Sequence, residues 1–388
     1  PTAILGGAVR LRVWEEEEFL SRREDYLDLL ERSDADRLFL SWEWLVEWWK
    51  AHREAYELTL RVFAAEAENG RVLGLAPMTL RPFRHRGGVL ATRMEPLGNL
   101  AGAEEYALTE YLTFPVDRRE SAGITALLAR FLLADSPWDD LVLSFVPLDS
   151  DTWRMVVDQE AARAGVYVRP ADHLLARVLD LEGGYETFLS GLGARSRRRI
   201  HHDRKRLARR GRVKFVVADE DTVEEGTAVL GRLGSQRWGS SAFSGPRGAL
   251  YRRVVEWAVA NGSLSLCYTA VGDHPLAAAL NLRRNGREYG IHLAVGGRGF
   301  RNVSPGFLHL GFMIQRCCED GIRHFDFLAS AREKRDYRRH FGGATSVLGT
   351  VHLVREKRLA LPYRWVDGLR RVRDRFRGGL GRFGGPVP

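Results

Sequence analysis

An internal repeat constrains the fold of this chain more than any other feature. The order hairpin, strand, loop, helix, strand occupies residues 58–146 and recurs over residues 264–328. Placing Tyr106 on Tyr289 without a gap brings Ser121 onto Ser304 and residues 142–145 onto residues 325–328. Two copies of such a unit predict a tandem duplication of similarly folded α/β domains, each of the α+β kind with a mixed sheet.

The segment between the copies places the domain boundary. Residues 153–164 have a helical pattern and residues 174–181 a strand pattern. We therefore expect an N-terminal domain over residues 1–170, non-catalytic, and a C-terminal domain over residues 171–355 that carries the donor site. Residues 356–388 are expected to form a basic amphipathic helix and a flexible tail.

Composition limits the classes of function. A chain of 388 residues with a net charge of +9 favours an anionic ligand, nucleic acid or an anionic membrane surface as partner. Its three cysteines, Cys267, Cys317 and Cys318, lack metal-site spacing and suit a reducing compartment, so we expect a cytoplasmic protein with no metal. No apolar run is long enough to span a membrane, although peripheral contact stays open.

Aromatic residues mark the core of the first half. Trp44, Trp48 and Trp49 fall on one helical face behind Ser41, a suitable N-cap. Such a stripe is typical of a buried core rather than of a ligand platform. Residues 58–80 flank a turn at residues 68–70 and predict a β-hairpin.

The second copy contains a helix start that is suited to an anion. Ser304 can cap this helix, Pro305 fits its first turn, and Gly306 leaves backbone N–H groups uncovered. Together with Arg298 and Arg301 just upstream, this end predicts a phosphate or diphosphate site. Simple capping, with no ligand, is the alternative.

Two further segments suggest binding. One is a basic helix with few acids, which either contacts an anionic partner such as tRNA or forms a solvated face: Arg195, Arg197, Arg198, Arg199, Arg204, Lys205, Arg206, Arg209 and Arg210. The other is the small polar loop that follows Trp238 and begins at Ser240, a candidate mobile substrate loop.

The sequence lacks a nucleophile elbow, HExxH, a P-loop and GxGxxG. It resembles the GNAT acyltransferases of the CelD/BcsL type and the related Fem-type aminoacyltransferases. The resemblance covers about residues 30–355 and rests on the second hairpin and strand, Ser304 to Gly306, and residues 325–328, 337–341, 40–44 and 209–211. It departs from the family at Arg338, where Lys is usual, and in the loop before Ser304, which lacks the usual pyrophosphate motif.

This resemblance implies tandem GNAT-like domains that move an acyl group from acyl-CoA, with acetyl-CoA the first expectation, to an amine or hydroxyl. His292 and Asp326 are the candidate bases, Tyr337 the candidate acid, and Trp238, Ser240 and Arg338 the candidate substrate contacts. Asp326 has a second interpretation as a buried structural acid. The acceptor is expected to be a small molecule, a polysaccharide precursor or a peptide.

Two alternatives remain open. One is a Fem-like enzyme that uses aminoacyl-tRNA, gripped by the basic segment at residues 195–210. The other is a non-enzymatic module that binds nucleic acid or anionic lipid on a degenerate transferase fold.

Overall fold

The computed structural model describes residues 3–5, 9–84, 88–102, 109–135, 137–239, 241–296, 303–330, 337–355, 359–361 and 363–365. Within them, no helix has the length and apolar character needed to cross a membrane.

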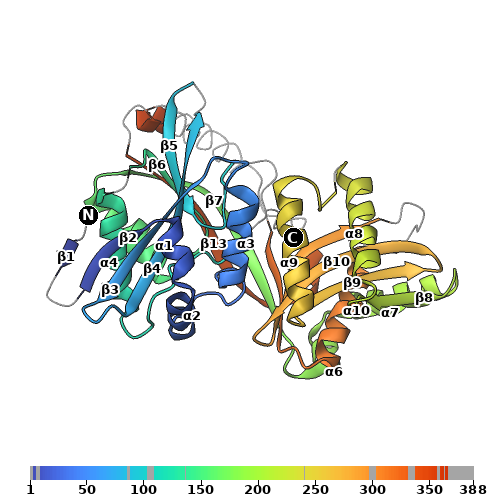
Figure 1. Ribbon diagram of the computed structural model, residues 1–388. Helices are drawn as coiled ribbons and strands as arrows, with labels where there is room; N and C mark the ends of the chain where they lie inside the picture. The colour runs from blue at the N-terminus through green and yellow to red at the C-terminus, as the bar shows by residue number, and fades with distance from the viewer. Residues whose placement is uncertain are drawn as a thin grey trace, which may run out of the picture.

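The described strands form one sheet, which joins two lobes (Figure 1). In chain order the strands are β1 (Ala3–Leu5), β2 (Val9–Trp14), β3 (Thr59–Ala67), β4 (Val72–Arg84), β5 (Leu90–Pro96), β6 (Asp140–Pro147), β7 (Tyr167–Asp180), β8 (Val213–Val217), β9 (Leu264–Val271), β10 (His274–Arg284), β11 (Arg287–Val295), β12 (His324–Ser330) and β13 (Ala344–Val354). Their order across the sheet is β1-β2-β3-β4-β5-β6-β13-β7-β12-β11-β10-β9-β8. The long strands β7 and β13 therefore form the bridge between the lobes.

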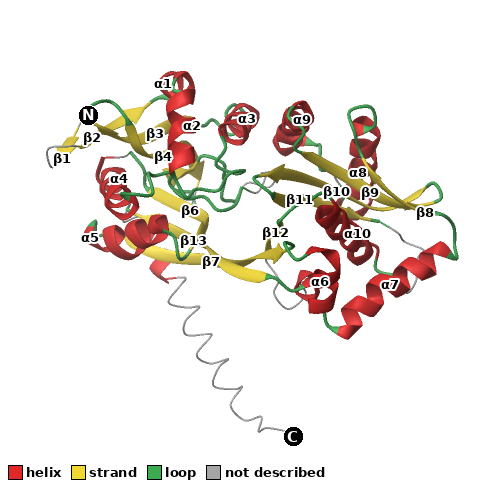
Figure 2. Cartoon of the chain, turned by 90° about the horizontal axis from the view of Figure 1, so that it is seen from below, coloured by secondary structure: helices red, strands yellow, loops and turns green. Residues whose placement is uncertain are grey.

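Helices cover both faces of the sheet (Figure 2). The helical segments are α1 (Glu16–Ser21), α2 (Arg23–Arg32), α3 (Trp42–His52), α4 (Ser121–Asp135), the π-helical η1 (Trp153–Glu160), α5 (Ala161–Arg163), α6 (Gly184–Gly191), α7 (Ala194–Ala208), α8 (Val223–Trp238), α9 (Gly245–Ala260), α10 (Pro305–Glu319) and the 3-10 helix η3 (Tyr337–Phe341). Helices α1–α3, α8 and α9 lie on one face, and α4–α7 and α10 on the other. Helix α3 of the first lobe packs directly on α9 of the second.

The repeat is visible in the strand pairing. Each half has a three-stranded antiparallel meander, then a helix, then a strand that pairs in parallel with the meander's last strand: β3-β4-β5-α4-β6 and β9-β10-β11-α10-β12. Phe145 and Leu328, equivalent positions in the predicted repeat, both have positive φ, 55° and 60°. The pairing register shifts near both residues, so the two copies share a bulge.

Two features differ from the sequence prediction. The expected strand that began at Tyr106 does not form over residues 109–114, and β5 at Leu90–Pro96 is the counterpart of β11. Tyr106 itself lies outside the described residues. The sequence did not indicate β5 as a strand, because Pro96 and Gly98 are residue types typical of irregular chain. The expected boundary at residues 170 and 171 falls inside the continuous strand β7, and the division into domains itself stays a prediction.

The aromatic stripe of α3 is confirmed as core. Trp44, Trp48 and Trp49 are at most 2% exposed, and the Ser41 hydroxyl caps the helix by accepting from the Trp44 N–H at 3.2 Å. The C-terminal segment begins against the bridge, with Leu359 buried on Val354, but most of residues 356–388 lies outside the described residues.

Candidate functional site

The parallel strands β11 and β12 diverge soon after they begin. They pair only from Arg287–His324 to Tyr289–Asp326, and β11 then continues to Val295 without β12 beside it. On its other edge β12 pairs with β7, both before and after its bulge. The two parallel strands of the second lobe therefore separate beyond Asp326, and we call the place where they separate the opening.

Asp326 is the centre of a buried polar cluster. Its carboxylate accepts from the Leu328 N–H at 2.8 Å and from the Tyr111 hydroxyl at 3.0 and 3.1 Å. Arg287 lies 3.5 Å away. Burial raises the pKa of Asp326 to about 6, against the opposing effects of the Leu328 N–H and Arg287. The side chain is fully buried, an arrangement that fits a structural acid better than a solvent-facing base.

The first lobe supplies two members of this cluster, Glu110 and Tyr111. Glu110 accepts from the Ala329 N–H at 2.7 Å, and burial together with Asp326 raises its pKa to about 8. Tyr111 has a φ of 55°, a conformation that side chains rarely adopt. Strain of this kind persists only where the surroundings enforce it. None of these first-lobe residues was predicted, because only the folded chain brings them beside β12.

Asp36 extends the cluster along β11. Its carboxylate accepts from the Tyr289 hydroxyl at 3.0 Å and from the backbone N–H groups of Leu38 and Phe39. Burial raises the pKa of Asp36 in spite of these bonds. The two lobes therefore meet through hydrogen-bonded acids rather than through apolar packing alone.

His292 lies on β11 past the last pair with β12, within the opening. Its ring is 6.0 Å from that of Tyr251 on α9. Burial, and secondarily the charge of Arg247, lowers the pKa of His292 to about 4. The imidazole is therefore neutral near pH 7.

The structure places the other predicted site residues only in part. Arg338 donates to the carbonyls of Phe327 and Leu328 at 2.7 and 3.2 Å, so it holds the bulge of β12. Tyr337 begins η3 and Trp238 ends α8, as the backbone shows. Ser240 lies outside the described residues.

At the N-terminus of α10 a side chain of the protein itself accepts a hydrogen bond from the backbone. The helix begins at Pro305 as predicted, but the Ser304 hydroxyl makes no capping hydrogen bond. Instead the buried carboxylate of Asp203, on α7, accepts from the Ser304 N–H at 3.2 Å. A Cβ on Gly306 would lie 3.0 Å from Val295, so this glycine serves packing against β11. Asp203 therefore takes up one of the backbone N–H groups at this end. The predicted Arg298 and Arg301 lie outside the described residues, and the diphosphate site stays a prediction.

In the first lobe, residues 109–112 lie beside the bulge of β6, which is equivalent to the bulge of β12 in the second lobe. The Leu112 N–H donates to the carbonyl of Phe145, at the bulge of β6, at 3.3 Å. Thr109, Glu110 and Leu112 are at most 2% exposed. The segment that was expected to be a strand therefore packs against the end of β6.

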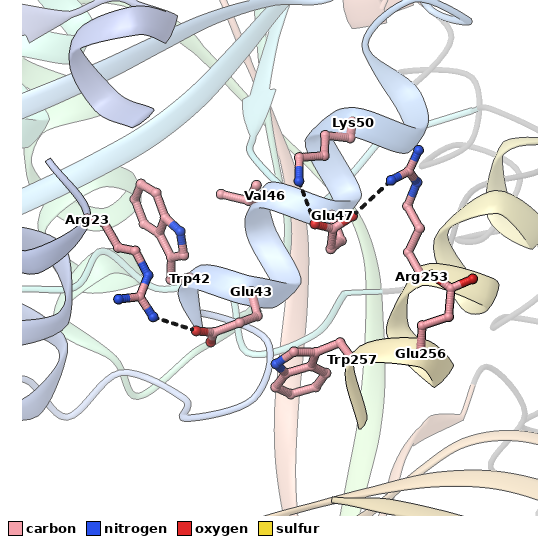
Figure 3. A pocket seen from close by; sticks show the side chains of 9 residues that line it. All are labelled: Arg23, Trp42, Glu43, Val46, Glu47, Lys50, Arg253, Glu256 and Trp257. Carbon is pink, nitrogen blue, oxygen red and sulfur yellow. Dashed lines mark hydrogen bonds and ion pairs between the residues drawn. The ribbon is translucent and has the colours of Figure 1, made fainter. Parts of the chain in front are cut away.

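A separate pocket of about 410 Å³ lies between α3 and α9 (Figure 3). Trp42 and Trp257 line it, with charged side chains around them. Arg253 lies 3.4 Å from Glu47, an ion pair between the lobes, and Lys50 pairs with the same carboxylate. The pocket presents both apolar and charged surfaces.

Helix α7 presents its basic residues outward. Ile200, Asp203 and Leu207 form the buried face, while Arg204 is held by Gln315 and the ring of Phe312 on α10. Seven of the remaining basic side chains in the segment at residues 195–210 are exposed: Arg195, Arg198, Arg199, Lys205, Arg206, Arg209 and Arg210. Among the described residues, no cluster of three or more His, Cys, Asp or Glu could hold a metal ion.

Comparison with known proteins agrees with this architecture. Residues 194–339, from α7 into η3, match a family model described as an acetyltransferase (GNAT) domain. FemX is structurally similar, with a TM-score of 0.57 and 11% identity over 87% of this chain and 97% of FemX. A conserved protein of unknown function from Bacteroides thetaiotaomicron VPI-5482 gives a TM-score of 0.51 and 13% identity over 89% and 100% of the two chains.

A tandem GNAT protein from the clavulanic acid biosynthesis pathway gives a TM-score of 0.47 and 14% identity, over 89% of this chain and 98% of that one. No curated protein matches the sequence. The expected fold class is confirmed, whereas the finer CelD/BcsL assignment stays a prediction. Residues 194–339 are thus similar to a GNAT acetyltransferase domain, and the chain shares its overall fold with FemX.

Proposed function

We propose that the protein is an acyltransferase whose reaction takes place in the opening between β11 and β12. The divergence of these strands carries the proposal. Past Tyr289, the edge of β11 that faced β12 has no strand partner among the described residues. An extended donor arm can pair with such an edge through main-chain hydrogen bonds. The acyl carbonyl would then lie beside His292.

The proposed reaction is direct attack by the acceptor. An amine or hydroxyl attacks the acyl carbonyl, and neutral His292 takes the proton that the nucleophile loses. The tetrahedral intermediate collapses with cleavage of the bond to the leaving thiolate or alkoxide, which is protonated in turn. Tyr337 is the predicted proton donor. Asp326 acts as a positioning residue, because its carboxylate fixes Tyr111 and the β12 bulge.

Acyl-CoA is the first candidate donor. The match of residues 194–339 to an acetyltransferase domain supports it. A diphosphate at the start of α10 would, however, have to displace Asp203 from the Ser304 N–H. If CoA binds there, Asp203→Asn should strengthen its binding, because the substitution removes a competing negative charge.

An aminoacyl-tRNA is the second candidate donor. The exposed basic face of α7 lies beside α10, and the similarity to FemX covers nearly the whole of both chains. A polyanion bound on α7 would not require the Ser304 N–H. Such binding should weaken steeply with salt, and substitution of Arg198 and Arg206 should reduce the slope.

The pocket between α3 and α9 is the proposed place for the non-reacting part of the acceptor. Tyr251 of α9 contacts His292, while Arg253 and Trp257 of the same helix line the pocket. Its mixed lining suits a ligand with both apolar and charged groups, such as a peptide or a polysaccharide precursor.

Thermal-shift titration tests the donor. Acetyl-CoA and CoA should raise the Tm if CoA is the donor, and deacylated tRNA should do so if RNA is. Thiol release from acetyl-CoA, followed with a panel of amines, tests the reaction. His292→Gln should lower the rate by about 100-fold or more without loss of donor binding. His274→Gln, at an exposed histidine, is the control. If His292→Gln retains the full rate, the assignment of His292 as the base is wrong. If no acyl transfer occurs with either donor, the result favours the alternative of a non-enzymatic binding module.

A further inference from the structure

A second pocket between the lobes lies at the other end of β11, away from the opening. Its volume is about 410 Å³, and it is formed by residues 33–37 and Arg118 of the first lobe and by the β10–β11 turn and the start of β12. Five arginines line it: Arg37, Arg118, Arg284, Arg287 and Arg323. A pocket of this size fits a small ligand, and its lining predicts a negatively charged one.

The β10–β11 turn explains why arginines converge here. Asn285 and Gly286 have φ values of 49° and 75°, the two left-handed residues of a tight hairpin turn. Arg284 and Arg287 flank that turn. A Cβ on Gly286 would lie 2.8 Å from Nε of Arg323, so the glycine also makes room for this guanidinium across the turn.

The acids around the pocket do not balance all five arginines. Arg118 pairs with Asp34 at 3.1 Å, Arg37 lies 3.6 Å from the exposed Glu31, and Arg287 faces Asp326. The same wall includes Asp36, which is engaged by Tyr289. Two arginines of the pocket, Arg284 and Arg323, take no part in these ion pairs.

Arg284 and Arg323 have no carboxylate within 4.0 Å among the described residues. Arg323 donates to the carbonyl of Asn285 at 3.3 Å, which orients its guanidinium without neutralising it. Two uncompensated charges therefore face the pocket from adjacent elements. Guanidinium groups bind phosphate oxygens with strong, often bidentate hydrogen bonds.

We propose that this pocket binds the phosphate or diphosphate group of a small ligand, through Arg284 and Arg323 of the second lobe and Arg118 of the first. The ligand bridges the two lobes. It also lies next to Arg287, so its charge acts on Asp326 through that side chain. The site does not depend on which donor the enzyme uses, because it lies outside the β11–β12 opening.

Isothermal titration of the whole chain with inorganic pyrophosphate at low salt tests the proposal. The wild type should bind, more weakly as salt rises, and the double variant Arg284→Gln, Arg323→Gln should bind at least about tenfold more weakly. The double variant Arg154→Gln, Arg163→Gln also removes two charges, at side chains 56% and 60% exposed outside the pocket, and should bind as the wild type does. The two pocket arginines lie at the surface, and a circular dichroism melt checks that the double variant folds.

Two outcomes would overturn the proposal. Equal binding of pyrophosphate by the wild type and the double variant would place the anion elsewhere, for instance at the start of α10. Equal or tighter binding of citrate, lost in the same double variant, would assign the pocket to carboxylates instead of phosphates.

Discussion

The buried carboxyl group of Glu110 should make the stability of this protein depend strongly on pH. Its pKa rises from 4.5 to about 8 through burial and the nearby Asp326. Between these pH values the folded state holds a proton that the unfolded state has released, so the free energy of unfolding falls as pH rises. Each pH unit costs about 1.4 kcal/mol, which amounts to about 5 kcal/mol over the whole interval.

The substitution Glu110→Gln isolates this effect. The amide keeps an oxygen that can accept the Ala329 N–H, now bonded at 2.7 Å, but it cannot ionise. The contribution of Glu110 to the pH slope therefore disappears. Relative to the wild type, the variant should gain about 1.4 kcal/mol per pH unit from pH 4.5 to 8, with the largest advantage at the alkaline end.

Urea unfolding at intervals between pH 5 and pH 8 measures the difference. Glu182→Gln, at an exposed glutamate, serves as the matched control and should follow the wild-type curve. If the wild type and Glu110→Gln lose stability in parallel as pH rises, Glu110 ionises normally in the folded state. The raised pKa assigned to Glu110 would then be wrong.

Three more substitutions test other parts of the fold by urea unfolding. Ser41→Ala should cost about 1 kcal/mol, because it removes the N-cap of α3. Gly349→Ala should cost about 1–3 kcal/mol, since a Cβ there would lie 2.5 Å from the ring of Trp153; no loss would mean that β13 can shift. Asp140→Asn should cost about 3–5 kcal/mol at neutral pH by leaving the buried Arg93 without its 2.7 Å partner. His352 and Arg93 lower the pKa of Asp140 in the folded wild type. The stability lost in Asp140→Asn should therefore become smaller as pH falls and Asp140 of the wild type is protonated.

Local patterns predicted the repeated elements well. Ser41 and Pro305 mark helix starts that the structure has, and both hairpins form as expected. The alignment of Phe145 with Leu328 was also correct, down to the shared positive φ. These features depend on residues close together in sequence, whose conformational preferences act before any tertiary contact forms.

Long-range pairing was the part that the sequence could not supply. β13 lies between β6 and β7, so the end of the second copy completes the sheet of the first. The hydrogen bond from Tyr111 to Asp326 joins residues 215 positions apart. No periodicity or cap specifies such a pair, and the register of the first copy was misplaced because β5 carries a proline at its end.

The asymmetry between the two copies explains how a duplication can build one site. In the first, residues 109–112 pack against the end of β6, and in doing so they direct Glu110 and Tyr111 towards β12 of the second. The segment that fills one copy therefore supplies the buried partners of the other. In an isolated second half Asp326 would lose the Tyr111 hydroxyl donor and part of the burial that raises its pKa. We therefore interpret the first half as part of the wall of the proposed site. A division of this chain inside β7 would disrupt that wall as well as the sheet.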